Sequence, residues 1–308
     1  MKRPDQQTRR SAWLKLIRAP NLLTVPGDPI AGTLLALSLS RTSVPDGGIL
    51  YVVMASLAFY VIGVVLNDVM DLPRDRKQRP ERPLVQKRIS KDHALLACTL
   101  LSIAGIILLA CAGTLALLVG LVLLLLVFGY NLALKKTYWG GSISMGLCRG
   151  INFLLGASIV SLTALPVWVV AAGVTAYIAT VTAFAKQENV AGAVSRTYLL
   201  TIWPVATFAL AIVFSAPGGH LTAPAILAAL LPLSILTVFT ALMASKLASA
   251  FATPADKQTI IGNLLRMLLF WQATYVLLSG LPFSWVPALI LVTAYPAHAA
   301  ISRKYTAS

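Results

Sequence analysis

A cluster of oxygen-bearing side chains dominates the polar chemistry of this sequence. It lies where an apolar segment ends and consists of Asn67, Asp68, Asp71 and Asp75. Because a helix turns by about 100° per residue, these side chains share one face if the helix continues through Pro73. Crowded carboxylates need a compensating cation, and Mg²⁺ prefers oxygen ligands of this kind. The spacing therefore predicts that these four residues form a Mg²⁺ site.

Basic residues occupy the same polar stretch. They are Arg74, Arg76, Lys77, Arg79 and Arg82. An arginine can bind a phosphate through two parallel hydrogen bonds, and Mg²⁺ commonly bridges carboxylates to phosphates. Acids, metal and bases together predict a diphosphate-binding site. A solvated charged loop is the alternative interpretation, but it explains the bases and not the acids that begin inside an apolar helix.

The elements that must position this cluster are membrane helices. Of the 308 residues, 58% are hydrophobic and only 11% are charged, which excludes both a water-soluble globule and a disordered chain. Segments with about the 20 residues needed to cross a bilayer lie at 20–40, 48–70, 92–112, 115–134, 142–163, 165–185, 197–216, 223–246, 260–280 and 283–302. They show no alternation of the porin type, so we expect an all-α bundle. The last two could be one span plus a re-entrant helix, which gives nine or ten spans.

The charge pattern predicts the orientation of the bundle. The net charge of +15 would suggest nucleic acid in a soluble protein, but in a membrane protein it fits an excess of basic residues in cytoplasmic loops. With residues 1–19 in the cytoplasm, only Arg41 of the 25 Lys and Arg residues falls on the opposite side. We therefore expect a single multi-pass membrane domain spanning 1–308. Residues 1–19 form a basic cytoplasmic segment, and residues 71–91 form a cytoplasmic loop carrying the acidic and basic cluster.

The order of residues from Asn67 to Leu84 resembles the first signature of the UbiA superfamily of intramembrane prenyltransferases. It reads Asn-Asp-x-x-Asp-x-x-x-Asp followed by Arg-Pro-x-Arg-Pro-Leu. Further matching positions are Arg18, Asn21, Asp28, Gly32, Tyr130, Lys135, Lys136, Arg149 and Asn152, with Asn131 standing where the family has proline. The resemblance implies helices around a central cavity, in a bacterial inner membrane with the active site on the cytoplasmic side.

The same resemblance implies a reaction. A Mg²⁺-dependent enzyme would transfer a prenyl group from a polyprenyl diphosphate to an aromatic or related acceptor. Catalysis would fall to Asp68, Asp71 and Asp75, with Asn67 and Glu188 as further metal ligands. The residues expected to bind the diphosphate are Arg79, Arg82, Lys135, Lys186 and Arg149.

The sequence departs from the family at its second acidic signature. Between residues 185 and 196, Glu188 is the sole acid. Two interpretations remain open. Either Glu188 holds a metal weakly, or Lys186 and Arg196 neutralise the diphosphate instead, and prenyl transfer is retained. Alternatively the protein binds, presents or moves an isoprenoid or lipid-like metabolite, as the resemblance to members with a degenerate second signature (the ebo type) allows. A secondary transporter is the rival from another class, but no ionisable residue lies deep inside a predicted span.

Overall fold

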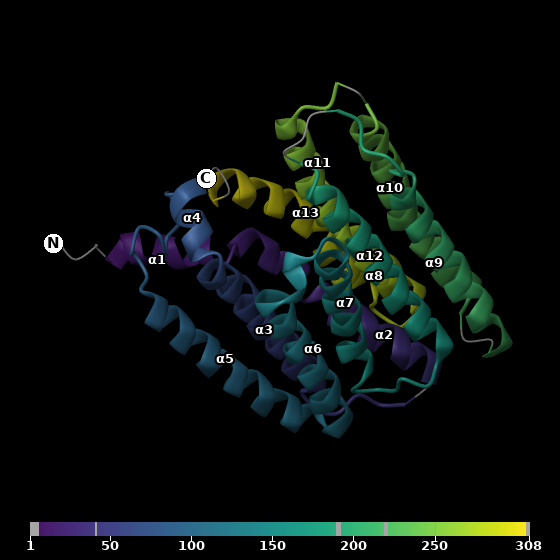
Figure 1. The fold of residues 1–308 in the computed structure, drawn as a ribbon. Helices are drawn as coiled ribbons and strands as arrows, with labels where there is room; N and C mark the ends of the chain where they lie inside the picture. The colour runs from purple at the N-terminus through teal and green to yellow at the C-terminus, as the bar shows by residue number, and fades with distance from the viewer. Residues whose placement is uncertain (1–5, 41, 189–191, 219–220, 250, 306–308) are drawn as a thin grey trace.

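The protein is a bundle of α-helices (Figure 1). The computed structural model describes residues 6–40, 42–188, 192–218, 221–249 and 251–305, and these contain no β-strand. The helices of the first half are α1 (Gln6–Leu16), η1 (Ala19–Thr24), α2 (Gly27–Ser40), α3 (Gly48–Met70), α4 (Leu72–Gln78), α5 (Lys91–Ala112), α6 (Thr114–Leu132), η2 (Leu134–Lys136) and α7 (Tyr138–Ala157). Those of the second half are α8 (Leu165–Ala185), α9 (Leu199–Ser215), η3 (Ala216–Gly218), α10 (Ala223–Leu247), α11 (Pro254–Arg266), α12 (Leu268–Leu278) and α13 (Trp285–Tyr305). The predicted all-α membrane fold is confirmed.

Eight elements of the described chain are long and apolar enough to cross a membrane. The predicted segment 260–280 consists of two helices, α11 and α12, which meet at Met267 and together form one apolar element, Pro254–Leu278. The segment 283–302 corresponds to α13, whose apolar part is Trp285–Ala300. The segment 142–163 corresponds to the more polar helix α7. The observed helices therefore agree with the expected nine or ten spans.

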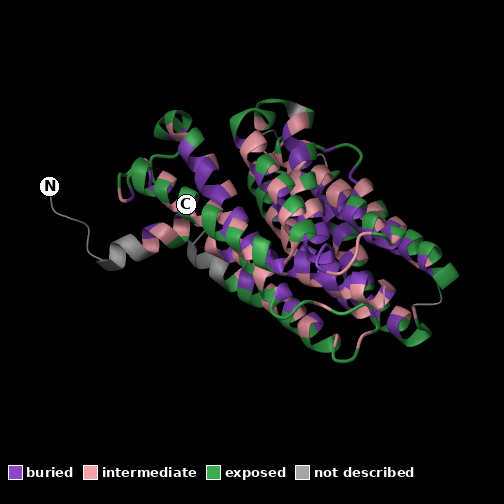
Figure 2. Ribbon diagram, turned by 90° about the horizontal axis from the view of Figure 1, so that it is seen from below, coloured by how far each residue is buried: buried purple, intermediate pink, exposed green. Residues whose placement is uncertain are grey.

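The exterior of the bundle is apolar, as a lipid environment requires. Buried residues concentrate along the middle of the bundle, and exposed residues line its outer sides (Figure 2). Many of these exposed residues are large and hydrophobic. Leu125 on α6 is 70% exposed and Leu227 on α10 is 68% exposed. In water such surfaces would drive association, whereas in a bilayer they face acyl chains.

Two hydrophobic clusters fill the interior. One joins α2, α7, α8, α10 and α12, and includes Tyr177 stacked on Trp271 with ring centroids 5.7 Å apart. The other joins α1, α3, α5 and α6 around Phe59 and Leu109. The pair α9–α10 lies along the edge of the bundle away from α5 (Figure 1). The two clusters meet along α7, since Leu154 belongs to the first and Leu155 to the second.

Glycines allow α2 and α7 to approach each other closely. A Cβ atom at Gly156 would collide with the Pro29 carbonyl oxygen, and one at Gly32 would collide with the Phe153 carbonyl oxygen. Thr33 Oγ1 completes the contact by donating to the Gly156 carbonyl oxygen at 2.8 Å. Small residues commonly permit such close packing between membrane helices. This contact brings the start of α2 against the polar residues of α7.

We expect Gly156→Ala to destabilise the protein by about 1–3 kcal/mol, because the backbones of α2 and α7 must separate to admit the methyl group. Thermal unfolding in one detergent measures the effect. Gly262→Ala is the matched control, since nothing lies within 4 Å of a Cβ atom there and a helical glycine is replaced by a better helix former. An equal loss of stability in both variants would contradict this account of the helix contact.

Candidate active site

The four predicted metal ligands lie where α3 passes into α4. The backbone N–H of Asp71 donates to the Asn67 carbonyl at 2.9 Å, and that of Asp75 donates to the Asp71 carbonyl at 2.9 Å. Pro73 lies in the first turn of α4, where a missing N–H disrupts no helical hydrogen bond. Helical hydrogen bonding therefore continues from one helix to the next. Asn67, Asp71 and Asp75 follow one another at intervals of one turn.

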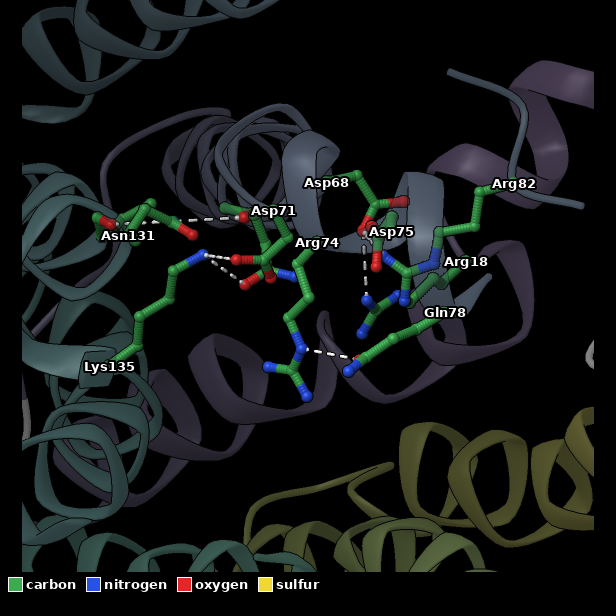
Figure 3. Close-up of polar contacts among 12 residues, drawn as sticks. Arg18, Asp68, Asp71, Arg74, Asp75, Gln78, Arg82, Asn131 and Lys135 are labelled. Atoms are coloured by element: carbon green, nitrogen blue, oxygen red, sulfur yellow. Dashed lines mark hydrogen bonds and ion pairs between the residues drawn. The ribbon is translucent and has the colours of Figure 1, made fainter. Parts of the chain in front are cut away.

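Asp68 and Asp75 share one arginine. Arg82 Nη1 lies 2.8 Å from Asp68 Oδ1 and 2.6 Å from Asp75 Oδ2, and Arg18 Nη2 reaches the same Asp68 oxygen at 3.4 Å (Figure 3). Both carboxylates are buried, with 7% of Asp68 and 5% of Asp75 exposed. Two buried carboxylates at this spacing would repel each other without a cation between them. Arg82 is that cation in this structure.

Asp71 and Asn67 form a second pair, which shares a lysine. Lys135 Nζ lies 2.8 Å from Asp71 Oδ1 and 3.2 Å from Asn67 Oδ1 (Figure 3). Lys135 comes from η2, the short helix that follows α6. Its neighbour Asn131 is buried and bonds the Gly63 and Val127 carbonyl oxygens at 3.2 and 3.0 Å. The bond to Gly63 fixes the end of α6 against α3 and so places Lys135 beside Asp71.

The donor set fits a hard divalent cation. Oxygen atoms of Asp68 and Asp75 converge on one positive group, and those of Asn67 and Asp71 converge on another. As the side chains stand, no group of three or more His, Cys, Asp or Glu side chains in the described ranges surrounds a single metal position. The arginine binds the two carboxylates Asp68 and Asp75, and the lysine binds the Asp71 carboxylate and the Asn67 amide oxygen. Both pairs therefore present oxygen atoms to a positive charge, and oxygen is the ligand type that Mg²⁺ takes.

A cavity of about 370 Å³ opens beside these ligands. Asn67, Arg18 and Tyr130 are among its polar lining residues. Its apolar walls come from α3, α6, α8 and α11 and include Phe59, Val64, Leu123, Val127, Ile178, Val181, Ile261 and Leu265. The cavity lining thus combines charged and polar groups with a large apolar surface.

Arg149 lies at the wall of this cavity in a buried polar network. Its Nη1 lies 2.8 Å from Asp28 Oδ2, and its Nη2 donates to Thr24 Oγ1 at 2.9 Å. Asn152 and Gln272 also donate to the Asp28 carboxylate, at 3.1 and 2.7 Å. A buried ion pair is tolerated when further hydrogen bonds satisfy its atoms in this way. In this structure the guanidinium binds Asp28, and its predicted contact with a diphosphate stays a prediction.

The remaining predicted site residues are Lys186, Glu188 and Arg79. The first two lie in the segment 185–196, where the second acidic signature is missing. Lys186 Nζ donates to the Thr137 carbonyl at 3.0 Å, and a Cβ atom at Gly141 would lie 3.0 Å from the same nitrogen. Partial burial lowers the pKa of Lys186 below its usual range. Burial raises the pKa of Glu188, while the nearby charge of Arg79 opposes that rise. Arg79 itself is exposed.

Sequence reasoning named Arg18 without a role or partner, and it assigned no site role to Gln272 or His298. Arg18 pairs with Asp68, Gln272 bonds Asp28, and His298 lines the cavity. Their partners lie 50, 244 and 277 residues away in sequence, for His298 through its contact with Asn21. No local spacing could indicate such contacts. The best available signal is the polar or charged type of these residues next to or within apolar segments.

The chain matches known proteins over most of its length. The sequence model of the UbiA prenyltransferase family matches residues 30–262. Among curated relatives, the digeranylgeranylglyceryl phosphate synthase of Methanococcoides burtonii is 29% identical over 168 residues, which cover 51% of this chain and 58% of that protein. The synthase of the same name from Methanosarcina mazei is 32% identical over 164 residues, covering 48% and 54%. The chain thus spans about half the length of the curated relatives it matches.

Solved structures share the fold. A structure described as that of digeranylgeranylglyceryl phosphate synthase in membranes matches with a TM-score of 0.63 at 19% identity, covering 88% of this chain and 98% of that one. A UbiA homologue from Archaeoglobus fulgidus matches with a TM-score of 0.59 at 14% identity, covering 88% and 100%. The same homologue bound to GPP and Mg²⁺ matches with a TM-score of 0.54 at 14% identity, covering 86% and 99%. At these identities the similarity establishes the architecture.

We expect Arg82→Gln to destabilise the protein by roughly 3 kcal/mol, because it leaves Asp68 and Asp75 buried without their shared cation. Millimolar Mg²⁺ should recover part of the loss, since a hard cation can take the place of the guanidinium. Thermal unfolding with and without Mg²⁺ measures both effects.

Arg74→Gln is the control for this experiment. Arg74 is exposed and bonds only Gln78 among the described residues, at 2.8 Å. It should unfold like the unaltered protein at every Mg²⁺ concentration. If Arg82→Gln loses stability but Mg²⁺ recovers none of it, the metal does not bind between these two carboxylates.

Proposed function

Because the chain belongs to the UbiA prenyltransferase family, we propose that it transfers a prenyl group from a polyprenyl diphosphate to an acceptor molecule in the membrane. The observation that carries the proposal is that Asn67, held by Lys135, and Arg18, paired with Asp68, line a cavity that also has a large apolar lining. A diphosphate fits beside Asn67 and Arg18, and a prenyl chain fits against the apolar lining. We further propose that this end faces the cytoplasm, in the inner membrane of a bacterium, because the basic loops lie on the same side.

In the proposed reaction, Asn67, Asp68, Asp71 and Asp75 hold Mg²⁺. The metal would supply charge stabilisation to the diphosphate as it leaves. Arg82 and Lys135, now bound to carboxylates, would donate instead to phosphate oxygens once diphosphate and metal are present. The bond between the prenyl C1 atom and the diphosphate oxygen breaks, and the diphosphate takes the electron pair.

The prenyl C1 atom then bonds to the acceptor, which loses a proton. Between these events an allylic cation must be kept from water. The apolar walls around Val64, Leu123 and Val181 exclude water from that position. The relatives' name favours a glyceryl phosphate lipid as the acceptor of this chain, and an aromatic acceptor is the other candidate.

A second candidate function rests on a different observation. The segment 185–196 carries one acid, Glu188, so a second site with several carboxylates has no residues to form it there. A protein of this kind could bind and present a prenyl diphosphate or a lipid-like metabolite without cleaving it. Release of diphosphate distinguishes the two functions, because only the enzyme produces it.

We expect Asp68→Ala and Asp71→Ala to lower Mg²⁺-dependent diphosphate release by roughly 100-fold or more, as expected on losing electrostatic stabilisation of a leaving group. The assay gives geranyl, farnesyl and geranylgeranyl diphosphates to the protein in lipid nanodiscs, with geranylgeranylglyceryl phosphate or pooled aromatic acceptors. Asp46→Ala is the control. Asp46 is exposed and precedes the first residue of α3, at the end of that helix opposite the acidic cluster. Full activity in both site variants would refute the metal assignment. Tight Mg²⁺-dependent binding without release would instead favour the carrier.

We also propose that Lys186 supplies positive charge where the family's second acidic signature is absent. Lys186→Ala should weaken Mg²⁺-dependent farnesyl diphosphate binding about 10-fold, whereas Lys246→Ala, on the exposed side of α10, should not. Burial lowers the pKa of Lys186, so its ammonium is lost as pH rises through that lowered value. Binding should therefore weaken at alkaline pH sooner than an ordinary lysine would allow, and Lys186→Arg should remove the decline. Equal affinity in Lys186→Ala and the unaltered protein would exclude this role.

A further inference from the structure

A second set of polar groups lies in the cavity wall, apart from Asn67 and the acidic cluster at the end of α3. Tyr60 on α3, Asn21 on η1 and His298 on α13 all line the cavity. His298 is hydrogen-bonded to Asn21 and to Arg266 on α11, and the Asn21 side chain lies near the Tyr60 hydroxyl. Four elements far apart in sequence thus meet at one polar cluster, which the proposed handling of diphosphate and metal does not use.

Arg266 determines which atom donates and which accepts in this series of hydrogen bonds. A guanidinium can only donate, so Arg266 Nε donates to His298 Nδ1, at 3.0 Å. The second nitrogen, Nε2, then carries the ring proton and donates to Asn21 Oδ1, at 3.2 Å. Arg266 is itself held by the Asn263 side chain, whose Oδ1 lies 2.8 Å from Nη1. The amide oxygen of Asn21 is therefore committed to the histidine.

The consequence falls on Tyr60. With its oxygen bound to His298, Asn21 has only amide protons to offer the nearby Tyr60 hydroxyl. The Tyr60 oxygen can accept from them, which leaves its own proton to be donated. Within the described part of the chain, no hydrogen bond has the Tyr60 hydroxyl as donor. A hydroxyl group whose proton has no hydrogen-bond acceptor costs free energy until an oxygen atom accepts a hydrogen bond from it.

The position of Tyr60 relates this donor to the acid pairs. Tyr60 precedes Asn67 by seven residues of α3, which places the two on the same helix face and about 10 Å apart along the axis. Both line the same cavity, and apolar Val64 lies between them. Arg18 and Arg149 line this cavity as well. Their positive charges favour a substrate oxygen that carries partial negative charge.

We propose that Tyr60 binds a hydroxyl or carbonyl oxygen of the acceptor substrate, and that Asn21, His298 and Arg266 are positioning residues that keep its hydroxyl a donor. This inference rests on the proposed function, since it assigns the second substrate of the same cavity. The acceptor then lies against α3, nearer to the start of that helix than the diphosphate. The acceptor must then carry an oxygen able to accept a hydrogen bond within reach of the prenyl C1 atom.

Binding measurements on the full-length protein in nanodiscs test the assignment. The probes are geranylgeranylglyceryl phosphate, 4-hydroxybenzoate and, separately, farnesyl diphosphate with Mg²⁺. Tyr60→Phe should weaken binding of at least one of the first two by about 5- to 10-fold, as expected for one hydrogen bond, and leave farnesyl diphosphate binding unchanged. Tyr51→Phe is the matched control, because Tyr51 lies on the same helix but does not line the cavity.

A separate set of measurements tests the positioning residues. His298→Leu should reproduce the loss seen in Tyr60→Phe, whereas His298→Gln, whose amide can still donate to Asn21, should restore most of the affinity. ¹⁵N NMR of histidine-labelled protein should show His298 protonated at Nε2, and its signal is identified by its absence from His298→Gln. A proton on Nδ1 would overturn this assignment of donors and acceptors.

Two outcomes would overturn the acceptor site itself. One is that the unaltered protein binds neither acceptor probe, and the other is that Tyr60→Phe binds both as tightly as the unaltered protein. Failure of the proposed function is a separate result. A protein that releases no diphosphate, yet binds an acceptor probe through Tyr60, would keep this site on a carrier.

Discussion

The structure depends on the neutralisation of buried carboxylates. Asp68 and Asp75 can lie side by side at the end of an apolar helix because Arg82 stands between them, and Asp71 is held by Lys135 in the same way. Each cation comes from outside the helix that carries the acids. Arg82 lies in the segment after α4, and Lys135 follows α6. The charge requirement thus determines which loops must fold over the end of α3.

A second charge pair sets the interior of the cavity. Arg149 and Asp28 meet because glycines let α2 and α7 approach closely, and Gln272 adds α12 to the same contact. Since charge in a low-dielectric interior is tolerated only with its partners in place, this network fixes three helices relative to one another. The hydrogen bonds of His298 with Arg266 and Asn21 add α11, α13 and η1. The polar contacts of the interior therefore join helices from both halves of the chain.

Membership of the UbiA prenyltransferase family is compatible with one unusual feature of the chain. Where the segment after α8 would be expected to supply several acids, it supplies Lys186 and a single Glu188. Lys186 packs over Gly141 and bonds the Thr137 carbonyl, on the loop that follows Lys135. This position is the basis of the proposal that Lys186 supplies positive charge to a bound diphosphate.

The sequence by itself determined the membrane class, the helices and the first acidic cluster. Hydrophobic runs and residue spacing are local properties, and the backbone must form helices in lipid whatever the neighbouring segments do. It also predicted that Asn67, Asp71 and Asp75 would share one helix face if the helix continued through Pro73. The structure instead has two helices, α3 and α4, that meet at Asp71, and the N–H groups of Asp71 and Asp75 still bond the carbonyl groups one turn earlier. The break between α11 and α12 was not foreseen, because a run of apolar residues does not reveal where a helix bends.

Only the tertiary structure decided which charges meet. The sequence indicated that Arg82 and Lys135 belong to the site, but not that each binds a separate pair of ligand residues, nor that Arg149 is bound to Asp28. It gave no sign that His298 faces Asn21 across 277 residues. Such contacts depend on how helices cross and on which small residues let them approach. Those distances arise from packing of the whole bundle, and no local pattern along the chain encodes them.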